Sequence, residues 1–200
     1  MNTFLTIDLD YWSNGDDINS KYIDDSLCLV PVENRYLCHF HQNVLPVANS
    51  YVDCDKLVNV DTHSDICGNA NEILNCGTWV DRVKWRKHAE YHWYSPRESD
   101  YDWPGGLSLC DGQRHDVFGD QDHSWGVAKH LPGDLYTPAL REHVVAVAVC
   151  LSIDWFDQNS AVSALARRKF KSLLKTRAAR LIDSCDGGEY GIWRGRPKMF

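Results

Sequence analysis

Short apolar runs recur along the chain and are separated by polar or amphipathic stretches. Each run has the length of a single β-strand, and charged or turn-forming residues follow most of them. The run at 142–154 is apolar almost throughout, which is typical of a strand buried on both faces of a sheet. The predicted strands are residues 3–12, 26–33, 55–61, 142–154 and 179–185.

Helical periodicity is clearest between residues 160 and 181. Apolar residues fall on one side and basic residues on the other, so this segment is predicted to be an amphipathic helix with a solvated basic face. Its apolar positions are Val162, Leu165, Ala166, Phe170, Leu173 and Leu174. Weaker helical or turn patterns cover 13–25, 35–50 and 71–93, and we expect a long polar loop at 94–138 and a surface tail at 187–200.

The alternation of strands with helical segments predicts the fold class. We expect a single α/β domain over residues 1–200, with three α/β/α layers and a mainly parallel sheet. In such sheets, binding sites form beyond the carboxyl ends of the strands. The side chains that follow each predicted strand are therefore the first candidates for chemistry.

Acids and imidazoles follow three of the early segments. The sequence "LVNVDTHSDIC" places two acids and a histidine at alternate positions, and "TFLTIDLDYW" ends in two acids with the same spacing. Alternate residues of an extended strand point to one face, so these groups are expected to share a rim. The segment "LCHFHQN" adds His41, with His39 as its rival. The candidate metal ligands are Asp8, Asp10, His41, Asp61, His63 and Asp65.

Four carboxylates and two imidazoles exceed what one divalent ion needs. The set therefore predicts two ions that share carboxylates, and oxygen-rich ligands without a thiolate favour Mn²⁺ over structural zinc. The simpler alternative is a group of solvated acids in turns after the strands. A later pair, Asp154 and Asp157, competes for the role of acidic pair, but its spacing of three does not match.

Composition and charge narrow the class of protein. The net charge is −7, and a basic cluster occurs only in "RRKFKSLLKTRAAR", which argues against nucleic acid as a partner. None of the eight cysteines forms a CxxC pair, and no apolar run has membrane-spanning length. The opening "MNTFLTIDLD" lacks the regions of a signal peptide. We therefore expect a cytoplasmic protein with reduced thiols and no membrane contact.

The motifs "DTHSD" and "IDLDYW", together with His41, resemble those of the ureohydrolase superfamily, which contains arginases and agmatinases. The acidic pair comes late in ordinary arginases and first here, as in a small divergent branch in which "LNCGTWV" also has a counterpart. The peptide arginases are most similar. The motifs cover about the first eighty residues, and the resemblance implies an arginase/deacetylase-like fold.

The resemblance also implies an activity. Peptide arginases convert arginine side chains of a ribosomally made precursor peptide into ornithine and urea, using two Mn²⁺ ions. Asp65 and His63 would be the catalytic residues, with Asp65 passing a proton from the attacking water to the leaving amine. Asp154, by analogy, and Trp12 and Trp79, by position, are the expected substrate contacts. A proton-shuttle histidine stays open among His88, His92, His115 and His123.

Three alternatives remain at this stage. The chain could hydrolyse a free small molecule such as arginine, agmatine or an acetylated amine. It could instead be a metal-bearing module that binds a leader peptide without chemistry. A phosphoesterase is the third reading, but the chain lacks an evident phosphate loop or basic clamp.

Overall fold

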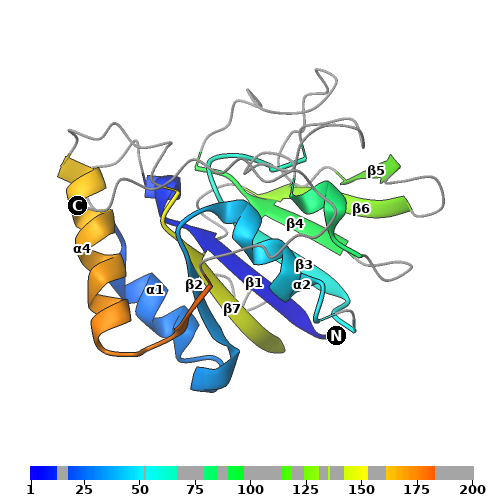
Figure 1. The fold of residues 1–200 in the computed structure, drawn as a ribbon. Coiled ribbons are helices and arrows are strands. Elements are labelled where there is room, and N and C mark those ends of the chain that lie inside the picture. Colours follow the sequence, from blue (N-terminus) through cyan, green and yellow to red (C-terminus); the bar gives the residue numbers. More distant parts are fainter. Residues whose placement is uncertain are drawn as a thin grey trace.

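A computed structural model describes the chain at residues 1–12, 18–51, 53–66, 79–84, 90–96, 114–118, 124–130, 135, 142–152 and 161–182. These residues build one eight-stranded sheet in the order β5-β6-β4-β3-β1-β7-β2-β8 (Figure 1). All neighbouring strands run parallel except β5 and β6. The strands are β1 (Thr3–Asp8), β2 (Arg35–Cys38), β3 (Lys56–Val60), β4 (Glu90–Tyr94), β5 (Arg114–Phe118), β6 (Ser124–His130), β7 (Val144–Cys150) and β8 (Arg180–Ile182).

Helices cover both faces of the sheet. On one face, α1 (Ser20–Leu27) and α4 (Ala161–Lys175) pack through Tyr22 and Phe170 into one apolar core. On the other face, α2 (Leu45–Ala48) shares a second core with Trp79 and Trp93 (Figure 1). The 3₁₀ turns are η1 (Leu9–Trp12), η2 (Val32–Asn34), η3 (His41–Val44) and η4 (Val80–Arg82). The predicted three-layer α/β/α fold with a mainly parallel sheet is confirmed.

Strand β1 lies at the centre of the sheet. It pairs with β3 on one side and with β7 on the other, and all six of its residues are buried. A parallel strand covered on both faces has no solvated side, so its sequence is nearly all apolar until the strand ends. Asp8 is the last residue of β1, and it lies in register with Cys150 of β7. The carboxyl end of the sheet therefore receives the first charged side chain of the chain.

Several sequence-based predictions are confirmed by this architecture. The segments 3–12, 55–61, 142–154 and 179–185 contain β1, β3, β7 and β8, and the segment 160–181 contains α4. Four of the predicted apolar positions of α4 are buried and the other two pack against the core. No helix in the described ranges is both long and apolar enough to span a membrane.

The predicted strand at 26–33 is wrong. Helix α1 continues through Leu27, and the side chain of its N-cap Asn19 accepts a hydrogen bond of 2.9 Å from the Tyr22 backbone N–H. The apolar residues that suggested a strand are partly in contact with solvent, with Leu29 36% and Val32 47% exposed. The strand forms instead at Arg35–Cys38, inside the segment predicted as a helix or turn.

Two other segments also differ from the sequence prediction. Strand β4 occupies the end of the segment 71–93, for which helical spacing was expected. Strands β5 and β6 lie within the segment 94–138, which was predicted to be a loop. The alternation in β4 covers only Glu90–Tyr94, too short to outweigh the helical spacing before it. In β5 and β6, charges, a histidine and a glycine interrupt the alternation that identifies a strand. The predicted tail at 187–200 lies outside the described residues.

Candidate metal centre

The candidate centre lies at the carboxyl ends of the central strands. Asp8 ends β1, Asp61 directly follows β3, and His41 begins η3 shortly after β2. Strand β7 lies between β1 and β2, and the register aligns Asp8 with Cys150 and Cys150 with Cys38. Parallel pairing thus brings residues from positions 8, 41 and 61 to one edge, as the rule for parallel sheets predicts.

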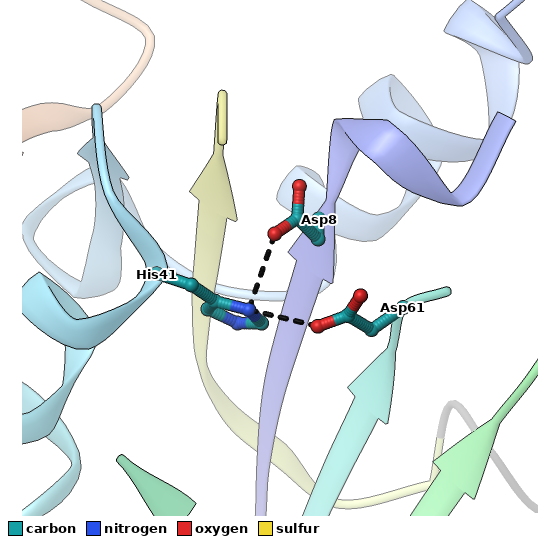
Figure 2. A group of neighbouring side chains, drawn as sticks. All are labelled: Asp8, His41 and Asp61. Atoms are coloured by element: carbon teal, nitrogen blue, oxygen red, sulfur yellow. Dashed lines mark ion pairs between the residues drawn. The ribbon is translucent and has the colours of Figure 1, made fainter. Parts of the chain in front are cut away.

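The first ligand group converges on the imidazole of His41. Its Nδ1 atom lies 3.2 Å from Asp8 Oδ2 and 2.9 Å from Asp61 Oδ2, the two approaches drawn in Figure 2. The same nitrogen lies 2.8 Å from Asp65 Oδ2. One nitrogen cannot donate a single proton well to three acceptors, and Nδ1 makes no hydrogen bond of acceptable geometry within the described part of the chain. Three carboxylates therefore crowd one imidazole nitrogen, and His41, Asp8 and Asp61 could hold a metal ion between them.

A second group forms around His63. Its Nδ1 atom lies 3.3 Å from Asp10 Oδ2 and 3.6 Å from Asp61 Oδ1. Asp61 belongs to both groups, since Oδ2 faces His41 and Oδ1 faces His63. The two groups that could hold a metal ion are Asp8, His41 and Asp61, and Asp10, Asp61 and His63.

All four carboxylates of this cluster are buried. Asp8, Asp10, Asp61 and Asp65 are each at most 2% exposed, and His41 is 1% exposed. Among the described residues, no lysine or arginine pairs with any of these acids, and Asp10 Oδ1 has no hydrogen-bond donor. Burying so much negative charge without compensation is strongly unfavourable, so the acids must be neutralised by protons or by a metal ion, which this cluster could hold.

The spacing of the ligand atoms suits a metal ion. Bonds of about 2.1 Å at right angles, as in octahedral coordination, separate neighbouring ligand atoms by about 3 Å. Within the first group, the contacts of His41 Nδ1 with Asp8 and Asp61, at 3.2 and 2.9 Å, match that separation. The donors are carboxylate oxygens and imidazole nitrogens, which manganese and similar divalent ions accept.

Asp65 reaches the cluster through an unusual backbone conformation. Its φ of 56° lies in the left-handed region, which is uncommon for residues other than glycine but tolerated by aspartate. Trp79 Nε1 donates a hydrogen bond of 2.5 Å to Asp65 Oδ2, and the Trp79 ring packs 4.9 Å from the His41 ring. One buried indole therefore contacts both the His41 imidazole of the first group and Asp65 beside it.

Two hydroxyl groups orient the other ligands. Thr6 Oγ1 lies 2.8 Å from His41 Nε2, and this contact holds Nδ1 toward the carboxylates; with a metal ion on Nδ1, Nε2–H would donate to Thr6. Ser152, at the end of β7, donates to Asp8 Oδ2 from a left-handed backbone with φ of 44°. These contacts are the supporting interactions that hold metal ligands in one orientation.

Strand β3 supplies further support from beneath the cluster. Asn59 Nδ2 lies 3.3 Å from Asp61 Oδ2 and 3.0 Å from the Tyr91 hydroxyl, which itself donates to the Ser64 carbonyl at 2.6 Å. Neither Asn59 nor Thr6 was predicted from the sequence. A signal for both existed, because each precedes a ligand by two residues on the same face of its strand. No such pattern marks Ser152, whose position depends on a turn.

Burial dominates the protonation of the acids. Burial raises the pKa of Asp10 well above its usual range, and the charges of Asp8 and Asp61 raise it further. Burial and the charge of Asp61 likewise raise the pKa values of Asp8 and Asp65. Burial would also raise the pKa of Asp61, but the neighbouring imidazoles of His41 and His63 outweigh it and hold that pKa below its usual range.

The pKa values of the two imidazoles are raised, although burial alone would lower them. Burial lowers the pKa of His63, but hydrogen bonds to Asp10 and Asp61 outweigh it and raise the pKa to about 12. Burial also acts to lower the pKa of His41, yet Cys150, Asp65 and Asp61 raise it well above its usual range. Protons therefore take the place of cations at this cluster, and a metal ion must displace them.

The structure places the other predicted site residues differently. His39 packs 5.1 Å from the ring of Phe170, away from the cluster, so His41 is the histidine of the centre. Trp12 packs on Tyr22 of α1 at 6.3 Å between ring centroids. Trp79 was expected to line a groove, but it is fully buried and supports the ligands instead.

Some candidates cannot be placed. Asp154, Asp157, His88 and His123 lie outside the described residues, and the side chain of His115 in β5 is not described. His92 belongs to strand β4, not to a helix, and its Nδ1 lies 2.9 Å from His130 Nε2.

The chain was also compared with known proteins. No protein-family profile, no curated protein and no solved structure matches it.

Proposed function

We propose that the chain is a dinuclear manganese hydrolase that cleaves guanidino groups of arginine side chains in a peptide, giving ornithine and urea. The observation that carries the proposal is the pair of ligand groups that share Asp61. Four carboxylates balance the charge of two divalent ions when both imidazoles are neutral ligands. One ion would leave the buried cluster with excess negative charge.

Hydrolysis needs a nucleophile, and two divalent ions held by these residues would supply one by lowering the pKa of a bound water. The chain supplies proton transfer and orientation. Asp65 would accept a proton from the attacking water and pass it to the leaving ornithine nitrogen, since its Oδ2 atom faces the first group and is fixed by Trp79. His63, with a side chain 22% exposed, is the most accessible member of the cluster and would meet the substrate first.

The choice of an arginine substrate rests on two supports. The motifs "DTHSD" and "IDLDYW" resemble those of ureohydrolases. A guanidinium is a permanent cation, and the net charge of −7 favours its approach to the protein.

The test is product analysis with the manganese-loaded protein. An arginine-containing synthetic peptide should release urea and lose the mass that separates arginine from ornithine. Asp8→Ala and Asp61→Ala should abolish the release. Urea from free arginine alone would correct the substrate, and metal binding without urea from any guanidine would contradict the proposed activity.

A free guanidino compound such as agmatine is the second candidate. The low exposure of the cluster favours a small substrate, because a bulky peptide would have less access to buried ligands. Five of the six candidate ligands are at most 2% exposed, and the exception is His63. Parallel assays of peptide, arginine and agmatine under the same conditions separate the two substrates by their kcat/KM values.

A further inference from the structure

Positive charge is concentrated in one segment of this acidic protein. Residues 158–182 contain seven of the 21 lysines and arginines and no aspartate or glutamate. The other 14 basic residues share the rest of the chain with all 28 acidic residues, a formal charge of −14. The basic residues of this segment are Arg167, Arg168, Lys169, Lys171, Lys175, Arg177 and Arg180.

Helix α4 presents three of these cations as a stripe. Arg168, Lys171 and Lys175 are exposed and lie three and four residues apart, so they follow one face of the helix. Within the described ranges none of the three forms an ion pair, in contrast to Lys169, which binds Asp24 at 2.5 Å. A solvated helix usually balances its charges internally, and this one does not.

A recess lies beside the stripe. Its volume is about 430 Å³, and it lies between α4 and the start of α1. It is lined by Ile18, Ser20, Leu165, Arg168, Lys169 and Ser172. Lys169 already pairs with Asp24, so Arg168 is the cation left for a ligand. Together with two hydroxyls and two aliphatic side chains, it suits a carboxylate-bearing side chain whose stem is apolar.

Helix α4, which carries the stripe, lies beside an element of the candidate metal centre. Helix α4 packs against η1, which carries the candidate ligand Asp10. Figure 1 shows α4 running from the level of η1 along the side of the molecule. Fifteen helical residues span about 22 Å, the length of roughly seven extended residues.

We propose that this face of α4 binds an acidic stretch of the peptide substrate, lying within about ten residues of the target arginine. The inference rests on the proposed function and deepens it by naming what the substrate carries besides arginine. The acidic remainder of the protein disfavours nucleic acid on so narrow a stripe.

The test uses two fluorescein-labelled peptides with the full-length, manganese-loaded protein. Both contain one arginine, and one carries a run of glutamates near it where the other carries glutamines. Exposed ion pairs contribute modestly, so several together should tighten binding roughly tenfold for the glutamate peptide. That advantage should shrink as salt is added. In turnover, KM should differ between the peptides while kcat stays the same.

Charge reversals localise the effect. Arg168→Glu and Lys175→Glu should each weaken binding of the glutamate peptide several-fold and leave the glutamine peptide unchanged. Lys84→Glu is the matched control, because Lys84 is exposed and the reversal alters the net charge equally. It should have little effect on either peptide.

The outcomes separate this inference from the proposed function. Equal affinity for both peptides, with urea still released, overturns the docking surface alone. Binding without urea from any peptide overturns the proposed function and the inference together. Displacement of the glutamate peptide by single-stranded DNA at lower concentrations than by free glutamate peptide would also overturn the inference.

Discussion

Asp61 is the residue on which the candidate centre most depends. Each of its two oxygens faces a different imidazole, at 2.9 Å for His41 and 3.6 Å for His63. Its backbone N–H and carbonyl are fixed by β4, through the Tyr94 carbonyl at 3.1 Å and the Trp93 indole at 2.9 Å. The side chain is therefore positioned from the sheet itself.

Replacing Asp61 should affect both ions. In Asp61→Asn we expect manganese binding to be lost, because both groups lose a charged oxygen. Asp10→Asn touches the second group only and should keep the ion held by the first. Metal content after dialysis measures the difference. Equal manganese in both variants would show that Asp61 is not shared.

Thr6 should act through His41. Thr6→Val keeps the shape of the side chain but removes the partner of Nε2, at 2.8 Å. Loss of such a supporting contact typically lowers metal affinity by about 10- to 100-fold. Thr6→Ser retains the hydroxyl and should retain the affinity. Competition with a metal indicator gives both values, and unchanged affinity in Thr6→Val would contradict the role.

For single residues, the sequence allowed the candidate ligands to be predicted, but not all of the side chains that hydrogen-bond to them. Alternation within a strand identified Asp61, His63 and Asp65 because the spacing of side chains along a strand is fixed. It could not identify Ser152 or the hydrogen bond from Trp79, since these depend on turns and on long-range packing.

Helix α4 shows what periodicity predicts at the scale of an element. Its apolar stripe was clear in the sequence, and its residues pack into the core beside α1. The predicted strand at 26–33 failed because an apolar run does not reveal whether it ends a helix or forms a strand. Asn19 as the N-cap of α1 was the more informative signal.

Phe170 should anchor α4 to the sheet. It is 2% exposed, and Phe170→Ala should lower the free energy of unfolding by roughly 3–5 kcal/mol. Lys171→Ala, at the exposed neighbouring position, should change it by less than about 0.5 kcal/mol. Urea denaturation followed by circular dichroism measures both, and similar values would mean that α4 is not anchored by this ring.

The protonation of the centre affects the stability of the whole molecule. The folded state raises the pKa values of Asp8, Asp10 and Asp65, so it binds more protons than the unfolded chain. His63, raised from 6.5 to about 12, acts in the same direction. The lowered pKa of Asp61 has the opposite effect on stability, but only when the pH falls to about the ordinary pKa of an aspartate or below it.

The metal-free protein should therefore become more stable as the pH falls from roughly 8 to 5. With saturating Mn²⁺ the sign should reverse, because protons then compete with the ions for the same ligands. Melting temperatures measured across this range, with a chelator or with manganese, test the prediction. The same slope under both conditions would show that the cluster does not bind the metal.

The pairing of β1 with β7 also affects how the chain must fold. Residues 3–8 cannot gain this neighbour until residues 144–150 have been synthesised. Pairings so distant in sequence slow folding, and an apolar strand that has not yet paired with its neighbour is prone to aggregation. A nascent chain that stops before β7 would therefore depend on chaperones, although it already carries every candidate ligand of the centre.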